Sequence, residues 1–281
     1  MIDQDIEAGA AHVGGDVTQK IALGVAYNGS EFEGWQKQPH GRTVQDLLEA
    51  ALSEINGSPV DLVCAGRTDT GVHARQQVVH FETSAERPLV AWVKGVNSQL
   101  PKTVAVQGAQ IVPQEFHARF SAKSRTYRYY FYTARSPDPF KQQMSWIHYP
   151  LNLRKMLEAG QCLLGTHDFS SFRAGQCQAK SPIRTLMRLE MHPLQDYAYV
   201  ELQGNAFLHH MVRNIMGCLF EVGLGRKPVE WVAEILALKS RVHAARTYPS
   251  QGLTLWEVEY PEAFRIGDLF KPSFPFQDLT T

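Results

Sequence analysis

The 281-residue sequence lacks the long apolar segments that cross membranes and the cysteine patterns that bind zinc. It contains no run of eighteen apolar residues, so we expect no membrane span. The four cysteines lie far apart, form no CxxC pair, and are Cys64, Cys162, Cys177 and Cys218. Scattered thiols are typical of a reducing cytoplasm and argue against a metal site. We therefore expect a cytoplasmic protein without a bound metal.

The first nineteen residues lack any Lys or Arg but hold four acidic residues. A signal peptide needs a basic start and an apolar middle, so we interpret residues 1–19 as a disordered leader. We assign residues 20–115 and 116–261 to an N-terminal and a C-terminal half, and residues 262–281 to a tail.

The chain as a whole lacks net charge, with 28 basic and 28 acidic residues. The balance changes when residues 1–19 and 261–281 are set aside, because the remainder holds 26 basic and 21 acidic residues, a net charge of +5. Two segments, 116–137 and 169–189, carry several Lys and Arg and no acid. Basic segments interleaved with Phe and Tyr favour a phosphate-backbone ligand. Either segment alone could also be a solvated face.

Hydrophobic periodicity predicts the same order of elements twice, strand–helix–strand–strand–helix–strand. The first round comprises strand 20–29, helix 43–57, strands 60–66 and 76–83, helix 89–101 and strand 103–112. The second comprises strand 125–133, helix 151–165, strands 183–192 and 197–204, helix 206–225, an extra helix 229–240 and strand 253–260. Thr43 is the predicted N-cap of the first helix and Gly57 its stop. We therefore predict an α+β fold of two tandem ferredoxin-like (βαββαβ) halves, with antiparallel sheets and a central cleft that binds the ligand.

One triplet, Asp69-Thr70-Gly71, is the signature of aspartic proteases. Such proteases need two aspartates that share a proton, and the other half of the chain has no second copy. Arg67 lies two residues before the carboxylate and would keep it ionised. The sequence therefore argues against a protease.

The longer string "AGRTDTGVHARQQVVHF" resembles the catalytic loop of the tRNA pseudouridine synthase A family, whose signature is a GRTD-x-GVHA segment. Four further blocks resemble that family in its order: "YNGSEFEGWQKQ…TVQDLLEAAL", "FHARFSAKSRTYRY", "LLGTHDFSSFRA" and "NAFLHHMVRNIMGCLFEVG". The resemblance covers residues 20–260. Two departures, Asn28 in a turn that usually reads Y-D-G and Thr254 in place of an aromatic, affect turn geometry and pocket lining rather than the reaction.

This resemblance implies an isomerase that converts uridine to pseudouridine in the tRNA anticodon stem-loop, at RNA positions 38, 39 and 40. It also implies a homodimer, an RNA-binding cleft and no cofactor. The runner-up from another class is an RNA-binding module of similar fold in which Asp69 is structural. A pure binder would have no need of a carboxylate near phosphates, which favours the enzyme.

The resemblance assigns Asp69 the role of nucleophile, while the residues alone would also allow a turn or cap. Attack at C6 of uracil or assistance at C1′ both remain open. Arg213 lies at the margin of a buried helical stripe and matches the salt-bridging arginine of the family. Alternatively, Arg213 is a surface arginine whose side chain extends along its own helix to solvent.

Tyr127 matches the tyrosine that stacks on the target base and is placed to take up the C5 proton. A tyrosine suits both roles because it has a π face and a polar tip. Its neighbours Tyr129, Tyr130 and Tyr132 are interpreted as sheet packing.

The remaining candidates are basic and histidine side chains. The resemblance assigns Arg67 to the flipping of the target base, with a phosphate contact as the alternative. Arg119, Lys123 and Arg173, from the acid-free segments, are predicted to contact RNA. The histidines considered for metal binding, His73, His209 and His210, lack a third ligand at convincing spacing and are interpreted as core or RNA-contact residues.

Overall fold

The computed structural model describes residues 18–271. The predicted leader lies outside the described residues apart from its last two positions, as do residues 272–281 of the predicted tail. The strands are β1 Gln19–Tyr27, β2 Val63–Cys64, β3 His73–Thr83, β4 Val104–Val112, β5 Ser124–Thr133, β6 Ser145–Ile147, β7 Gly165–Asp168, β8 Ile183–Pro193, β9 Ala198–Gly204 and β10 Leu253–Glu259. The α-helices are α1 Val44–Asn56, α2 Leu153–Gly160, α3 Met211–Gly223 and α4 Trp231–Leu238.

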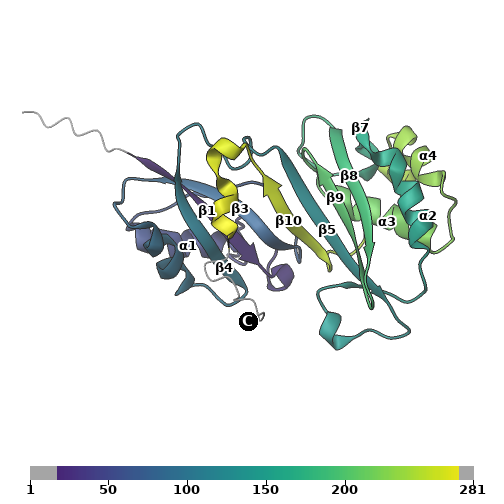
Figure 1. Cartoon of the computed structure of the whole chain (residues 1–281), viewed down its shortest axis with the longest axis horizontal. Coiled ribbons are helices and arrows are strands. Elements are labelled where there is room, and N and C mark those ends of the chain that lie inside the picture. Colours follow the sequence, from purple (N-terminus) through teal and green to yellow (C-terminus); the bar gives the residue numbers. More distant parts are fainter. Residues whose placement is uncertain (1–17, 272–281) are drawn as a thin grey trace, which may run out of the picture.

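All ten strands belong to one sheet, in which the main path runs β4-β1-β3-β10-β5-β9-β8-β7 (Figure 1). β2 pairs with β3, and β6 pairs with β5. The order β4-β1-β3-β2 of the first half is repeated as β10-β5-β9-β8 in the second, and every pair within these two sets is antiparallel. The α+β class predicted from the sequence is therefore confirmed.

The two halves do not keep separate sheets, which corrects the prediction of one sheet per half. β10 pairs in parallel with β3 through two residue pairs, Thr254 with His73 and Leu255 with Ala74. On its other edge β10 pairs with β5 over six residue pairs. The sheet is consequently mixed and continuous, with the last strand of the chain at its centre.

One face of the second half of the sheet is covered by helices and the other is open. Phe220 of α3 packs on Tyr129 and Phe131. Because every second side chain of a strand lies on the same face, Tyr127 also points to the covered face. The intervening residues of β5 point to the open face, where Arg128 and Tyr130 are half-buried and Thr126 and Tyr132 are buried. Figure 1 shows α1 at one end of the molecule and α2, α3 and α4 at the other.

Helix α1 follows the sequence rules closely. The Thr43 side chain accepts a hydrogen bond from the Asp46 amide, and Gly57 ends the helix at φ +81°. The helix predicted for 89–101 is shorter and contains a π-helical segment, Ala91–Gly95. The short strands β6 and β7 were not predicted, because three or four residues carry too little periodicity.

The described part of the predicted tail belongs to the folded body. A 3₁₀-helical segment, Ile266–Phe270, lies over β1 and β4, and its Ile266 and Leu269 side chains are buried. Glycines make this approach possible, since a Cβ on Gly108 would lie 2.5 Å from the Leu269 carbonyl oxygen. Among the described residues, no helix has the length and apolar character that a membrane crossing requires.

Candidate active site

The loop that carries Asp69 connects β2 to β3 and is held on several sides. The Tyr27 hydroxyl and the Thr68 hydroxyl are 2.8 Å apart, and the Trp35 amide donates to the Thr68 carbonyl at 3.0 Å. The buried Gln77 side chain donates to the Gly66 carbonyl at 2.6 Å. Because neighbours on both sides of Asp69 are fixed by the scaffold, the carboxylate is presented from a rigid loop.

Tight backbone approaches complete this support. Gly71 has φ +77° and follows Asp69 in a turn closed by the Val72 amide and the Asp69 carbonyl, 3.1 Å apart. Gly34, at φ +91°, lies directly behind the loop, where a Cβ would approach the Thr68 carbonyl oxygen to 2.9 Å. The segment around Gly34 thus acts as a spacer between α1 and the Asp69 loop.

The structure brings Arg213 to Asp69 from the other half of the chain. Arg213 projects from the first turn of α3, and its Nη1 lies 3.0 Å from Asp69 Oδ2. Its Nε donates to the Tyr248 carbonyl at 2.8 Å, which fixes the direction of the guanidinium. Both side chains are mostly buried, with 20% of Asp69 and 16% of Arg213 exposed. The guanidinium therefore faces the carboxylate in a partly desolvated, charge-assisted hydrogen bond.

Tyr127 is buried next to this pair. Its ring packs edge-on against Phe207, with centroids 5.1 Å apart. Burial, and secondly the negative charge of Asp69, raises the pKa of Tyr127. The free protein therefore holds Tyr127 as a neutral phenol.

The predicted RNA-contact residues differ in their surroundings. Arg67, Arg119 and Lys123 are exposed. Arg173 is half-buried, and its Nη2 donates to the carbonyls of Cys177 and Ala179, so part of its function is to hold its own loop.

The neighbouring basic residues of the acid-free segments are also partly used inside the protein. Arg125 is buried and donates to several backbone carbonyls, including that of Ala65 at 3.0 Å. Arg128 and Arg188 both pair with Glu201. The acid-free pattern therefore predicted more free cations than the fold presents.

Sequence reasoning missed the contacts of two histidines with Asp69. His209 Nε2 lies 3.3 Å from Asp69 Oδ1, and His210 Nε2 lies 3.4 Å from Oδ2. Asp69, from the other half of the chain, is the third possible metal ligand that the local sequence spacing did not show. One ligand atom from each of Asp69, His209 and His210 lies within 4.8 Å of the other two. The adjacent Arg213 guanidinium opposes a further cation, so we assign no metal here. His73 lies elsewhere and accepts a hydrogen bond from the Gly29 amide.

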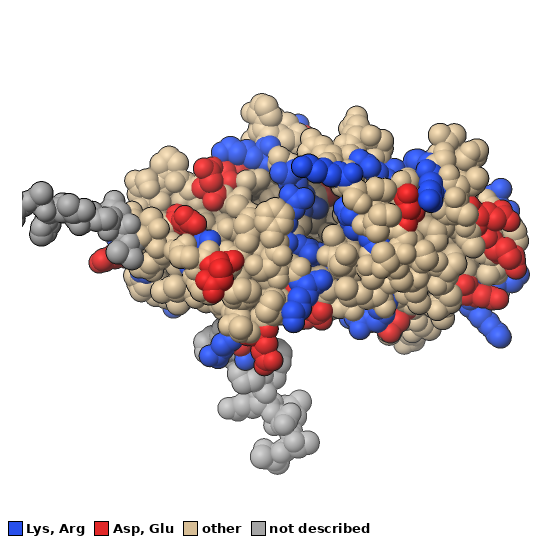
Figure 2. Space-filling view, turned by 90° about the horizontal axis from the view of Figure 1, so that it is seen from above, with Lys and Arg blue, Asp and Glu red and all other residues tan. Residues whose placement is uncertain are grey.

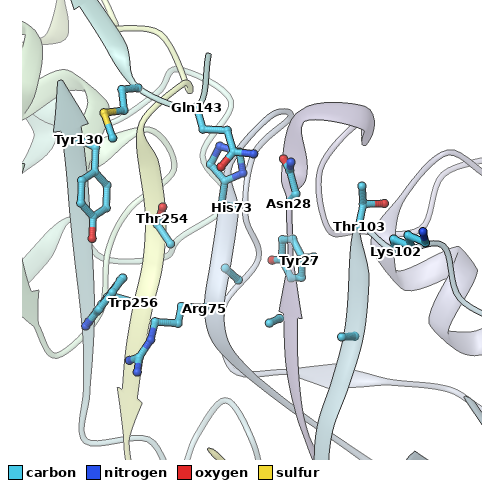
Figure 3. A pocket seen from close by; sticks show the side chains of 14 residues that line it. Tyr27, Asn28, His73, Arg75, Lys102, Thr103, Tyr130, Gln143, Thr254 and Trp256 are labelled. Carbon is cyan, nitrogen blue, oxygen red and sulfur yellow. The ribbon is translucent and has the colours of Figure 1, made fainter. Parts of the chain in front are cut away.

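A cavity of about 530 Å³, which Asp69 and Arg213 do not line, lies between the two halves (Figure 3). Tyr130, Thr254 and Trp256 line it from the second half, and Asn28, His73 and Arg75 from the first. Arg75 and Arg128 both stack on Trp256, with Cζ 4.4 Å and 3.8 Å from the ring centroid. Because Asp69, Tyr127 and Arg213 do not line this cavity, we place the chemistry outside it.

Comparison with known proteins identifies the chemistry. A family model described as tRNA pseudouridine synthase matches residues 24–121 and 159–261. That match places the chain in a class of isomerases that act on tRNA, and it sets aside the reading of a binding module without chemistry.

Individual relatives narrow the class. The chain is 50% identical to the tRNA pseudouridine synthase A of Paraburkholderia xenovorans over 94% of this chain and 98% of the relative. It is 51% identical to that of Paraburkholderia phytofirmans over the same shares, and 50% identical to that of Cronobacter sakazakii over 88% and 92%. The chain belongs to the tRNA pseudouridine synthase A family. A solved H/ACA ribonucleoprotein aligns with 10% identity over 72% of this chain and 53% of that one, at a TM-score of 0.32 that carries no argument.

Proposed function

We propose that the protein converts uridine to pseudouridine at positions 38, 39 and 40 of the tRNA anticodon stem-loop, with Asp69 as the nucleophile. The observation that carries this proposal is the Asp69–Arg213 pair, assembled from a loop of one half and a helix of the other. A buried carboxylate beside a guanidinium that is itself anchored to the backbone is typical of an active nucleophile rather than of a loop cap.

The reaction requires the N1–C1′ bond to break, the uracil to turn and a C5–C1′ bond to form. C5 then loses its proton, and N1 ends as an N–H group, so that product and substrate are isomers. A covalent bond from Asp69 to the base or the sugar would retain the fragments through this sequence. Because Arg213 stabilises the carboxylate as an anion, Asp69 can both form this bond and leave from it.

Tyr127 is proposed to stack on the target base and to take up the C5 proton. The nearness of its side chain to Asp69, whose charge acts on the Tyr127 hydroxyl, supports this pair of roles. Bond formation at Asp69 would remove the negative charge that contributes to the raised pKa of Tyr127. Loss of the phenolic proton, which N1 of the detached uracil can accept, is therefore easier in the covalent intermediate than in the free protein, and the phenolate that remains can take up the C5 proton.

The base must leave the helical stack before it reaches Asp69, and we assign this step to Arg67. Arg67 is exposed and lies two residues before the nucleophile, so it can follow the base into the site or fill the gap behind it. Arg119 and Lys123 would bind the neighbouring phosphates. Figure 2 shows Lys and Arg gathered around a hollow near the middle of the molecule, which is the charge pattern that a polyanion needs.

We further propose a homodimer in which the open face of the sheet meets a second copy. That face carries Tyr130, Tyr199 and Trp256, and the fully exposed Phe140 lies on the loop between β5 and β6. The three rings on the sheet are half-buried and Phe140 is exposed, and aromatic side chains are enriched in protein interfaces. Light scattering after gel filtration should give twice the monomer mass, and Phe140→Asp should shift it toward the monomer. A monomer at micromolar concentration would contradict this part of the proposal.

The experiment for the reaction uses tRNA transcripts labelled with tritium at C5 of uridine, without any added cofactor. Transcripts with uridine at only one of positions 38, 39 and 40 should each release tritium. A transcript with cytidine at all three should release none. Release from that control, or from none of the three single-uridine transcripts, would refute the proposed site.

A further inference from the structure

Two consecutive imidazoles contact the Asp69 carboxylate from the start of α3. His209 approaches Oδ1 at 3.3 Å and His210 approaches Oδ2 at 3.4 Å, and their ring centroids are 4.0 Å apart. Oδ2 also receives Arg213, whereas no side chain other than His209 pairs with Oδ1 among the described residues. Oδ2 of Asp69 is therefore contacted by two side chains and Oδ1 by one.

An unusual backbone conformation makes the double contact possible. His210 has φ +63°, in the left-handed region that is strained for a residue with a Cβ. Neighbouring side chains on an extended backbone point in opposite directions, and the left-handed residue lets both rings point the same way. The flanking backbone is fixed, since the His209 carbonyl accepts from Ala174 at 3.0 Å and the His210 carbonyl accepts from Asn214 at 2.9 Å.

The histidines are not needed to neutralise Asp69, because Arg213 already does so. Burial lowers the pKa of His210, and the positive charges of Arg213 and Arg241 oppose its protonation, as does His209, against the attraction of Asp69. His210 is therefore neutral at physiological pH. Because the Asp69 carboxylate already has Arg213 as its counter-ion, a neutral imidazole beside it can orient the carboxylate but does not neutralise its charge.

We propose that His209 and His210 are positioning residues that fix the rotation of the Asp69 carboxylate and present Oδ1 as the reacting oxygen. This inference rests on the proposed role of Asp69 as the nucleophile. Oδ2 is anchored by Arg213 and His210 from the protein side. Oδ1 has only His209, which is 41% exposed and can move aside when the base enters.

The test separates the contact from the backbone conformation. His210→Gly and His210→Asn both tolerate a left-handed backbone, and neither reaches Asp69. Each should lower the single-turnover rate constant about 10- to 100-fold, with the Kd for tRNA within twofold of the unmodified protein. The melting temperature of the glycine variant should be unchanged or higher, because strain is removed.

Further variants complete the design. His209→Ala should lower the same rate constant with unchanged Kd, and His209→Gln, whose Nε2 can take the place of the imidazole nitrogen, should recover most of it. The matched control is His148→Gln, an exposed histidine after β6 whose rate should not change.

Rates within twofold of the unmodified protein for the His209 and His210 variants would overturn the proposal, and so would losses that appear only as weaker tRNA binding. If Asp69→Asn is inactive in the same assay, either outcome refutes only the positioning role of the two histidines. An active Asp69→Asn protein would instead refute the proposed function.

Discussion

At the scale of single residues, the Asp69 carboxylate depends on groups that are distant in sequence but fixed in space. Arg213 is 144 positions away and is anchored by the Tyr248 carbonyl. The first prediction concerns Asp69→Asn, which removes the negative charge of this side chain. Asp69→Asn keeps the shape of the side chain and loses the nucleophile, so pseudouridine formation should fall below detection.

Binding of tRNA to Asp69→Asn should be unchanged or slightly tighter, because a negative charge near phosphates is removed. Tritium release and filter binding measure the two quantities separately. Turnover within tenfold of the unmodified protein would contradict the role of Asp69.

The second prediction concerns the Tyr127 hydroxyl. Tyr127→Phe keeps the ring and its packing on Phe207, so tRNA affinity should stay near that of the unmodified protein. Product formation should fall by at least the 10² to 10⁴ typical of a lost proton-transfer group. Rapid-quench sampling with mass spectrometry would look for a C5-linked intermediate. An unchanged rate would leave Tyr127 with stacking alone.

The sequence was informative about residues whose neighbours are local or belong to a recognisable block. It singled out Asp69, Tyr127 and Arg213, which the fold brings together. It missed the contacts of His209 and His210. Periodicity predicts which face of a helix a residue lies on, but it does not predict that the residue before the helix adopts a left-handed backbone conformation. The sequence did not indicate that the Arg173 guanidinium also holds its own loop, and its contact with RNA stays a prediction.

At the scale of elements, the turn containing Gly34 transmits the position of α1 to the Asp69 loop. Its carbonyl accepts from the Val44 amide of α1, and Trp35 donates to Thr68. Gly34→Ala, the third prediction, places a Cβ 2.9 Å from the Thr68 carbonyl oxygen at φ +91°. We expect a loss of roughly 1–3 kcal/mol in the free energy of unfolding and a loop displacement that lowers the rate constant at least tenfold.

The matched control is Gly57→Ala, at φ +81° with no heavy atom within 4 Å of the added Cβ. It should cost about 1 kcal/mol of stability and leave the rate constant intact. Urea unfolding and single-turnover assays measure both quantities. Equal kinetic losses in the two variants would show that Gly34 has no special relation to the loop.

The fourth prediction concerns His80 in β3, whose Nδ1 accepts the Ala118 amide and so joins β3 to the segment before β5. Burial, helped by His117 and Lys20, lowers the pKa of His80 to about 4. The unfolded chain, with a pKa of about 6.5, binds the proton more tightly. Stability from this group is therefore complete above pH 6.5 and is lost as the pH falls toward 4, by at most about 3 kcal/mol.

His80→Gln keeps an acceptor for the Ala118 amide and removes the titration. Its melting temperature should fall less between pH 7.5 and pH 5 than that of the unmodified protein. Parallel curves for the two proteins would contradict the assignment.

Elements with their own caps and long periodic patterns were predictable, as α1 demonstrates with Thr43 and Gly57. Elements defined by a partner were not. The strand predicted for 60–66 shrinks to Val63–Cys64, because the chain bends there into the Asp69 loop and only two residues pair with β3.

At the scale of the whole molecule, the fifth prediction concerns the basic surface. Lys123→Glu should weaken tRNA binding and reduce the slope of log K against log salt by about one, because a phosphate contact is lost. Lys155→Glu, an exposed lysine on α2, is the control and should change neither. Filter binding from low to high salt measures the slope. An unchanged slope for Lys123→Glu would place that residue outside the RNA surface.

The sequence also predicted the repeated order of elements, but not how the repeats join. Each half follows from local patterns, whereas the parallel pairing of β10 with β3 involves only two residue pairs, which join the two halves of the chain. A contact so short leaves no trace in periodicity.

The central place of β10 has a consequence for synthesis on the ribosome. Residues 253–259 leave the exit tunnel after every other strand, and until then the inner edges of β3 and β5 have no partner on that side. An unpaired strand edge is a site of aggregation, so the nascent chain is exposed to misassembly for as long as β10 has not emerged. The two halves can meet through the sheet only when β10 has been made, and the last strand to emerge therefore sets the moment at which the nascent chain can become an enzyme.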